Sequence, residues 1–162
     1  MKKLNVYVVD DDVFYLKSII LGLNPEYSDT VEFKYFFNAN ELLKKLNNEE
    51  DSADYVLLDY NLEISDRFNG MELIKEIKKI NSNVEIIVVS AQNNNQIILS
   101  TVKNGASSYI QKSPDILNSI RNVLNKAIIN AKQQKKIEPA ILLFLFLITL
   151  SIFMIFFFGI MT

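Results

Sequence analysis

The sequence predicts an α/β domain, built on an open five-stranded parallel sheet with helices on both sides, followed by an uncharged C-terminal helix. Five β-rich apolar segments alternate with helical segments along the charged part of the chain. Apolar residues make up 49% of the sequence, which is enough to bury a core. The 17 basic and 19 acidic side chains all lie at or before Glu138, so the chain divides into a charged body and an uncharged tail.

The expected strands are short and rich in Val, Ile, Leu and Tyr, and they cover 4–9, 31–36, 55–58, 86–89 and 108–110. The segments 55–58 and 86–89 are apolar on both faces, which is typical of central parallel strands. Glu32 and Lys34 alternate with apolar residues in 31–36, which suits an edge strand. Repeated strand–helix units favour an open parallel sheet with helices on both sides. We expect the strand order 2-1-3-4-5, in which the first and third strands are neighbours.

Helices are expected between these strands. The first runs from Val13 to Leu23, where Asn24-Pro25 should stop it. Asn38, with Glu41 three residues later, begins a second helix that continues to Leu46. The remaining helices are expected at 70–80, at 96–103, and from near Pro114 to about 136.

Two absences in the composition exclude several functions. The chain has no Cys and no His, so it has no disulfide, thiol nucleophile, Cys/His zinc site or Ser-His-Asp triad. It cannot carry a phosphohistidine relay either. The body has no strongly basic face, so nucleic acid is not an expected partner.

The tail from Ala140 to Ile160 contains only Leu, Ile, Phe, Ala, Met, Thr, Ser and Gly. A helix of this length spans roughly 31 Å, close to the ~30 Å hydrocarbon core of a bilayer. A buried core helix is the alternative, but a segment apolar on every face is too hydrophobic for a small domain to cover. We therefore expect residues 140–160 to form a transmembrane helix.

The flank of this segment predicts its orientation. Between Ile116 and Ile137 all the charged side chains are basic: Arg121, Lys126, Lys132, Lys135 and Lys136. The positive-inside rule then places the body in the cytoplasm as a tail-anchored protein of the cytoplasmic membrane. The expected organisation is a domain over 1–126, a basic helical stalk over 127–138, and a transmembrane helix with a short tail over 139–162.

Polar residues follow four of the five expected strands: Asp10, Asp11 and Asp12 after the first, Asp59 after the third, Ser90 after the fourth and Lys112 after the fifth. The carboxyl ends of parallel strands lie at one edge of the sheet, and the first and third strands are neighbours. Two converging carboxylate groups repel each other and require a cation. Oxygen ligands without His or Cys favour Mg²⁺ or a similar hard ion.

Each of these residues has a simpler interpretation when taken alone. The Asp triplet could cap the following helix, and Asp59 could belong to a turn. Ser90 could be a cap, and Lys112 a solvated charge. The complete set at four strand ends is improbable by chance, and it therefore favours a functional site.

These residues carry a resemblance to a known family over about 2–126. The matching segments are Val8-Val9-Asp10-Asp11-Asp12, Val56-Leu57-Leu58-Asp59, Val88-Val89-Ser90-Ala91, Asn104-Gly105-Ala106 and Tyr109-Ile110-Gln111-Lys112. They resemble the receiver domains of two-component response regulators, the CheY-like superfamily. The resemblance implies a flavodoxin-like fold.

The resemblance also implies roles for the acidic residues. Asp59 would be the phosphoacceptor, receiving a phosphoryl group from a histidine kinase or phosphotransfer protein. Asp11 would bind Mg²⁺ directly and Asp10 mainly through water. Asp59 and the backbone carbonyl of Asn61 would complete the protein ligands. Asp12 has no role of this kind, and we expect it to cap the first helix.

Three further residues would act on the phosphoryl group or respond to it. Lys112 would pair with the phosphoryl oxygens, and Ser90 would donate its hydroxyl to them. Tyr109 would swing inward as Ser90 does so, and this movement would transmit the change to the surface. The loop between Asp59 and Gly70 is longer than the family's usual loop, which leaves its shape open.

Three functions remain open at this point. The favoured one is a membrane-tethered single-domain response regulator that signals through contact with an unknown protein, with no enzymatic activity beyond its own phosphotransfer and dephosphorylation. The second is a non-phosphorylated membrane scaffold that keeps the fold. The third is a Mg²⁺-dependent phosphatase with Asp59 as nucleophile, although the chain lacks the expected second acid and cap domain. Residues 140–160 contain no Gly-xxx-Gly pattern, so the sequence gives no strong evidence for dimerisation through this segment. A homodimer is left open.

Overall fold

The computed structural model describes residues 3–48, 52–62 and 70–160, apart from the side chains of 134–140 and 155–160. The chain forms two compact units, residues 1–122 and 123–162. The first unit contains a five-stranded sheet, and the second is helical.

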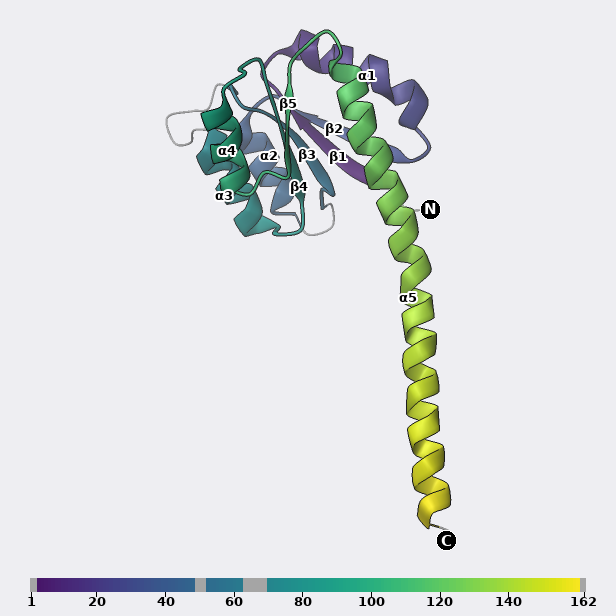
Figure 1. Cartoon of the computed structure of the whole chain (residues 1–162). Coiled ribbons are helices and arrows are strands. Elements are labelled where there is room, and N and C mark those ends of the chain that lie inside the picture. Colours follow the sequence, from purple (N-terminus) through teal and green to yellow (C-terminus); the bar gives the residue numbers. More distant parts are fainter. Residues whose placement is uncertain (1–2, 49–51, 63–69, 161–162) are drawn as a thin grey trace. The chain divides into compact units, whose positions relative to one another are not determined.

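The sheet of the first unit is entirely parallel, with the strand order β2-β1-β3-β4-β5. Its strands are β1 (Leu4–Val9), β2 (Val31–Phe36), β3 (Tyr55–Asp59), β4 (Glu85–Ser90) and β5 (Ser108–Gln111). The predicted fold class and strand order are confirmed, including the edge position of β2. All five strands therefore end at one edge of the sheet (Figure 1). Asp59 and Ser90 are the last residues of β3 and β4, and Asp10 and Lys112 directly follow β1 and β5.

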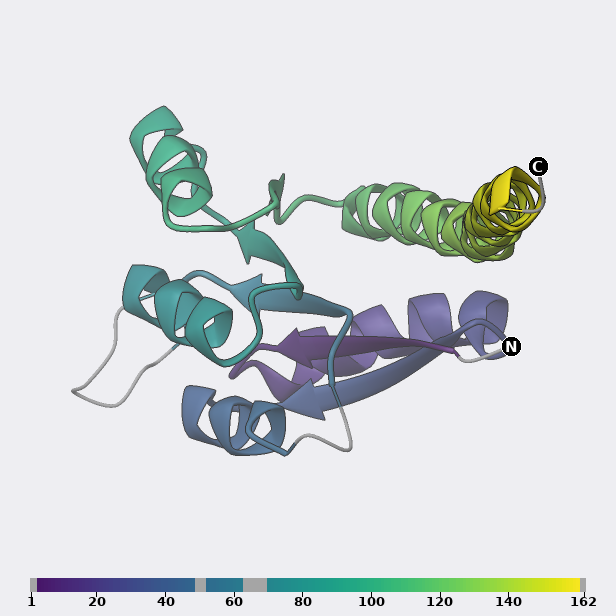
Figure 2. The same cartoon turned by 90° about the horizontal axis from the view of Figure 1, so that it is seen from below.

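The helices are α1 (Val13–Tyr27), α2 (Ala39–Leu46), α3 (Gly70–Ile80), α4 (Asn95–Lys103) and α5 (Ile116–Ile160). Within the first unit they cover both faces of the sheet, and Figure 2 shows α2 and α3 on the face opposite α1. A parallel sheet needs this double cover because both of its faces are apolar.

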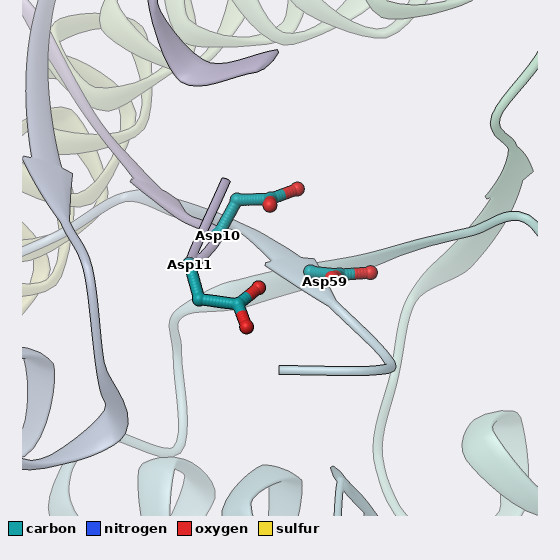
Figure 3. Close-up of side chains that lie close together, drawn as sticks. All are labelled: Asp10, Asp11 and Asp59. Atoms are coloured by element: carbon teal, nitrogen blue, oxygen red, sulfur yellow. The ribbon is translucent and has the colours of Figure 1, made fainter. Parts of the chain in front are cut away.

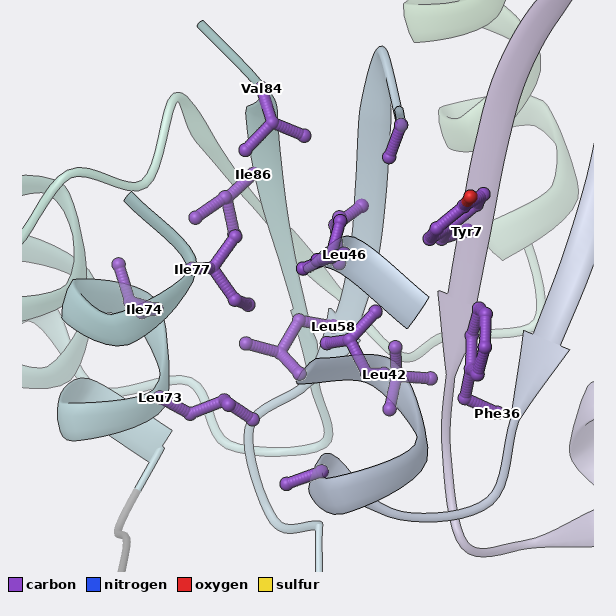
Figure 4. Packing of buried hydrophobic residues seen from close by; sticks show 14 of the residues in the cluster. Tyr7, Phe36, Leu42, Leu46, Leu58, Leu73, Ile74, Ile77, Val84 and Ile86 are labelled. Atoms are coloured by element: carbon purple, nitrogen blue, oxygen red, sulfur yellow. The ribbon is translucent and has the colours of Figure 1, made fainter. Parts of the chain in front are cut away.

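The main hydrophobic cluster lies between the sheet and the helices α2 and α3 (Figure 4). It is formed from alternate strand residues, including Tyr7, Leu58 and Ile86, and from helix residues such as Leu42 and Ile77. The strand positions between them, such as Val6, Val8, Leu57 and Ile87, are also fully buried. Since successive strand side chains point to opposite faces, the sheet is buried on both sides, as its continuous apolar runs predict.

Helix α1 is longer than predicted. It continues through Pro25 to Tyr27, although the Asn24-Pro25 pair was expected to end it at Leu23. Pro25 removes the N–H that would bond to the carbonyl of Leu21, but Leu21 is 76% exposed, so water can take that place. The extension buries Tyr27 and lets the Ser28 N–H donate to the carbonyl of Asn24, which offsets the loss.

Helix α5 runs without a break through the predicted boundaries near residues 126 and 139. Among the described residues, no helix is both long and apolar enough to cross a membrane. The span predicted from Ala140 to Ile160 is helical throughout, but its side chains are described only from Ile141 to Met154. The transmembrane helix therefore stays a prediction.

The lengthened loop between Asp59 and Gly70 is described only at Tyr60, Asn61 and Leu62. Its remaining residues, 63–69, lie outside the described part of the chain. The main chain of Tyr60 continues the pairing of β3, because its N–H donates to the carbonyl of Val89 at 2.9 Å. The chain directly after Asp59 is therefore still held against β4.

Candidate functional site

Three carboxylates meet at the carboxyl ends of β1 and β3. Asp10 and Asp11 directly follow β1, and Asp59 is the last residue of β3. The two strands are paired neighbours, with Val9 opposite Leu58, so the residues that follow them converge. One carboxylate oxygen from each acid lies within 4.8 Å of the others. Figure 3 shows the three side chains gathered at this point. Asp10 and Asp59 are buried, whereas Asp11 is exposed.

The turn from β1 into α1 orients these acids. The backbone N–H of Asp12 donates to Asp10 Oδ1 at 3.0 Å, which holds the Asp10 carboxylate in place. Asp12 Oδ1 in turn accepts the N–H groups of Phe14 and Tyr15, at 2.9 and 3.0 Å. The predicted capping role of Asp12 is confirmed, and the acids that cluster are Asp10, Asp11 and Asp59.

Lys112 brings a positive charge to the two buried carboxylates. Its Nζ atom lies 2.7 Å from Asp10 Oδ2 and 3.2 Å from Asp59 Oδ1. Strand β5 places it there, because the Lys112 N–H donates to the Ser90 carbonyl at 2.7 Å and extends the pairing with β4. The ammonium group is thus shared between the proposed acceptor and a neighbouring acid.

Burial and like charge shape the protonation of this cluster. Burial, and then the nearby Asp10 carboxylate, raise the pKa of Asp59, although Lys112 and the Asn61 N–H oppose the shift. Burial alone would lower the pKa of Lys112, but its bonds to Asp10 and Asp59 outweigh burial and raise that pKa. One ammonium group therefore faces two carboxylates at close range, so a further positive charge would be electrostatically favourable in this cluster.

The donor set suits a small hard cation. All the clustered ligand atoms are carboxylate oxygens, two of the three acids are buried, and the chain has no His or Cys. Mg²⁺ prefers such oxygen ligands and commonly uses only one or two carboxylates from a protein. The trio Asp10, Asp11 and Asp59 therefore suits a Mg²⁺ ion. The role of the Asn61 carbonyl as a ligand stays a prediction.

Ser90 and Tyr109 are linked through Gln92. Ser90 is completely buried, and its Oγ accepts the N–H of Gln92 at 3.1 Å. The Tyr109 hydroxyl donates to the Gln92 carbonyl at 2.5 Å, while its ring packs partly buried against the hydrophobic cluster. The two predicted switch residues therefore contact one short segment after β4. The movement of Tyr109 stays a prediction.

Two residues of this region were not anticipated from the sequence. Gln92 also donates its side-chain amide to Asn61 Oδ1 at 3.0 Å, which joins the segments after β3 and β4. Tyr15 lies beside Lys112, whose Nζ is 4.3 Å from the centre of the Tyr15 ring. A signal existed for Gln92, since it comes two residues after a strand end, but Tyr15 resembled an ordinary residue of a helix.

A match to a protein family identifies the domain. Residues 6–125 match the response regulator receiver domain, which is most of the chain. The chain belongs to this family, which is defined by a signalling domain and not by a classical enzyme activity.

Curated relatives agree with this assignment. The chain is 33% identical over 110 residues to the chemotaxis protein CheY of Thermotoga maritima, covering 66% of this chain and 83% of that protein. It is 26% identical over 115 residues to the transcriptional regulatory protein DegU of Brevibacillus brevis, covering 70% of this chain. That match spans only 45% of DegU, so it concerns less than half of the longer protein.

Solved structures share the fold at lower identity. A CheY-like receiver domain protein from Methanospirillum hungatei has a TM-score of 0.68 and 21% identity, with 82% of this chain and 99% of that chain covered. A response regulator from Burkholderia pseudomallei, solved with a phosphorylated aspartic acid and a calcium ion, has a TM-score of 0.63 and 21% identity. That match covers 84% of this chain and 75% of the other.

Proposed function

We propose that this protein is a membrane-tethered, single-domain response regulator that is phosphorylated on Asp59 and signals through contact with another protein. The observation that carries the proposal is the shared ion pair, in which the Lys112 ammonium contacts both buried carboxylates, Asp10 and Asp59. A lysine in this position can neutralise a phosphoryl group attached to Asp59. The structure of the Burkholderia regulator, which contains a phosphorylated aspartate, supports this chemistry for the fold.

The donor that we propose is a phosphohistidine of a kinase or phosphotransfer protein, because this chain has no His of its own. An Asp59 carboxylate oxygen forms a bond to phosphorus while the bond from phosphorus to the imidazole nitrogen breaks. The electron pair of that bond stays with the imidazole, which takes up a proton, and Asp59 becomes an acyl phosphate. Hydrolysis by water returns the carboxylate and releases phosphate.

Asp10, Asp11 and Asp59 would hold Mg²⁺ in this site, and the ion would supply positive charge that offsets the repulsion between phosphoryl oxygens and carboxylates. The chain's own residues position the acceptor. The Asn61 N–H lies 3.3 Å from Asp59 Oδ1 and limits the rotation of the acceptor carboxylate. The Lys112 Nζ atom lies 3.2 Å from the same oxygen, Asp59 Oδ1. Ser90 would contribute its hydroxyl from the neighbouring strand end.

The test is phosphorylation of the full chain in mild detergent by acetyl phosphate and Mg²⁺, followed by intact mass. We expect one added phosphoryl group that requires Mg²⁺ and is absent in Asp59→Asn. Asp29→Asn, which removes an exposed acid outside the cluster, serves as the matched control and should be modified normally. A folded wild-type protein that gains no phosphoryl group would contradict the proposal and favour the non-phosphorylated scaffold.

We further propose that residues 140–160 anchor the protein in the cytoplasmic membrane, with the receiver domain in the cytoplasm. The uncharged sequence supports this proposal, as do the large hydrophobic side chains that are exposed between Ile141 and Met154 on the described part of α5. Such a surface is unfavourable in water and favourable in a bilayer. The basic residues before it support the orientation.

Membrane anchoring is tested by fractionating cells that express the full chain and washing the membranes with alkaline carbonate. We expect the wild-type protein to stay in the membrane pellet. Replacing Leu147 and Leu150 together by Lys should release it, because each central Lys costs roughly 2.5–3.5 kcal/mol of insertion free energy. Replacing the same two residues by Ile is the matched control. A wild-type protein that is removed by the wash would contradict the anchor.

A further inference from the structure

Tyr15 combines two features that the proposed phosphorylation chemistry leaves unexplained. Its hydroxyl is buried and has no hydrogen-bond partner among the described residues. Its ring carries the Lys112 ammonium above it, with Nζ 4.3 Å from the ring centre. A cation at this distance over an aromatic face is attracted by the negative charge of the ring face.

The fold directs Tyr15 to this place. Its N–H is held by the Asp12 cap at 3.0 Å, so the residue lies in the first turn of α1. Helical side chains tilt toward the N-terminus of their helix, which here leads back to the turn that carries Asp10. The carboxylates of Asp10 and Asp59, after burial itself, raise the pKa of the Tyr15 hydroxyl, so the phenol stays neutral beside them.

The position of the Lys112 ammonium depends on contacts such as this one with the Tyr15 ring. Its ammonium lies at the end of a flexible four-carbon chain, and its shortest contact, 2.7 Å, is to Asp10. Asp10 is also one of the three acids that could hold a divalent cation. Such a cation would compete with the ammonium for Asp10 and repel it. The ring of Tyr15 attracts an ammonium without offering the oxygen ligands that Mg²⁺ prefers.

From this arrangement we infer that Tyr15 is a positioning residue, whose ring keeps the Lys112 ammonium at Asp59 when a divalent cation occupies the Asp10 carboxylate. The inference rests on the proposed phosphorylation of Asp59. It assigns the function to the aromatic face and none to the hydroxyl. Tyr15→Phe should therefore preserve the effect, and Tyr15→Leu should remove it.

The direct measurement is the NMR signal of the Lys112 ε-methylene in the full chain in detergent micelles, with ¹³C-labelled lysine. An aromatic face shifts nearby protons upfield, so we expect a displaced signal in the wild-type protein and in Tyr15→Phe. The signal should return to the position of a solvated lysine in Tyr15→Leu, with the largest change when Mg²⁺ is present. Loss of the signal in Lys112→Arg identifies it.

Kinetics provide the second measurement. With saturating Mg²⁺ and acetyl phosphate, we expect Tyr15→Leu to be phosphorylated about 3- to 30-fold more slowly than the wild type, the size of a typical cation–π contribution. Tyr15→Phe should react at close to the wild-type rate. Tyr55→Leu is the matched control, since Tyr55 is also half-buried but begins β3 at the opposite edge of the sheet.

The outcomes separate this inference from the proposed function. If the wild-type protein is phosphorylated but its Lys112 signal is not displaced, or if Tyr15→Phe is as slow as Tyr15→Leu, the positioning role is wrong while the response regulator stands. If the wild type takes up no phosphoryl group, the proposed function fails, and the NMR signal alone still decides whether the ring holds the ammonium. Should Tyr15→Leu fail to fold, the wild-type and Tyr15→Phe signals decide it.

Discussion

Lys112 and Asp10 are 102 residues apart in the sequence, yet the Lys112 Nζ atom lies 2.7 Å from Asp10 Oδ2. The same ammonium lies 3.2 Å from Asp59 Oδ1, so it links the ends of β1, β3 and β5. This ion pair connects the stability of the sheet edge with the chemistry that we propose for it.

Removing Lys112 should destabilise the protein in the absence of divalent cations. Lys112→Met leaves two buried carboxylates facing each other, and we expect the free energy of unfolding in urea with EDTA to fall by roughly 2–3 kcal/mol. The 22% exposure of Lys112 keeps the loss below that of a fully buried pair. Lys79→Met, which breaks an exposed pair with Glu76, should cost under about 1 kcal/mol. Equal losses in the two variants would contradict this prediction.

Addition of Mg²⁺ should restore much of the stability that Lys112→Met loses. A cation that binds only the folded state stabilises it, and the gain is larger where it relieves unopposed carboxylate repulsion. The measurement is urea unfolding at increasing Mg²⁺ concentration. We expect a larger increase for Lys112→Met than for the wild type, and no increase beyond the salt effect for Asp59→Asn combined with Asp10→Asn.

The raised pKa of Asp59 predicts how stability depends on pH. In the folded protein the pKa of this carboxyl lies above 3.8, its value in the unfolded chain. Between pH 3.8 and the folded pKa, the Asp59 carboxyl is more protonated in the folded state than in the unfolded state. The contribution of Asp59 to the free energy of unfolding therefore falls as pH rises through this range. Asp59→Asn lacks this term, so without Mg²⁺ it should be more stable than the wild type at neutral pH.

The check is urea unfolding in EDTA from pH 3.5 to 7.5 for the wild type, Asp59→Asn and Asp29→Asn. Other carboxyl groups also titrate in this range, so the difference between variants is the informative quantity. The stability advantage of Asp59→Asn should grow as pH rises. An advantage that is constant with pH, or that appears equally in Asp29→Asn, would contradict the prediction.

Gly105 is required by the backbone before β5. It has a φ of +108°, which L side chains rarely adopt, and an added Cβ would lie 3.2 Å from Lys78 Cγ. We expect Gly105→Ala to lower the free energy of unfolding by about 1–3 kcal/mol. Repeating the substitution in a Lys78→Ala background separates the two causes, because the backbone strain remains when the side-chain contact is gone.

The sequence predicted most of this architecture because its signals are local. Continuous apolar runs identified the central strands, and the residue after each strand marked one edge of the sheet. Asp10 and Lys112 directly follow their strands and Asp59 ends its strand, so strand order alone brings them together. Asp12 was recognisable as a cap because it stands immediately before a helical pattern.

The unpredicted features depend on contacts between distant segments. Gln92 lies in an irregular segment, and its bond to Asn61 depends on how two loops meet. Tyr15 joins the site because of the tilt of a helical side chain toward a lysine that comes much later in the sequence. The continuation of α1 past Pro25 depends on the burial of Tyr27, which outweighs a local stop signal. The sequence pattern does not encode these contacts.

The final prediction concerns the path from Ser90 to the surface. Gln92 is bonded to both predicted switch residues, since its N–H donates to Ser90 Oγ at 3.1 Å and its carbonyl accepts from Tyr109 at 2.5 Å. If Ser90 turns its hydroxyl toward a phosphoryl group, the position of Gln92 changes and Tyr109 responds. Tyr109→Phe keeps the ring and removes this bond, so the segment 91–94 should become less protected and β5 should lose its coupling to Asp59.

Hydrogen exchange measured by mass spectrometry checks this prediction in the full chain, with and without Mg²⁺ and beryllofluoride as a phosphoryl mimic. In the wild type we expect the mimic to change exchange both in residues 91–94 and in β5. In Tyr109→Phe the first change should persist and the second should be lost, with a stability cost of about 0.5–1.5 kcal/mol for the missing bond. Tyr55→Phe is the control at the opposite edge of the sheet. A β5 response that survives in Tyr109→Phe would show that the signal leaves Ser90 by another route.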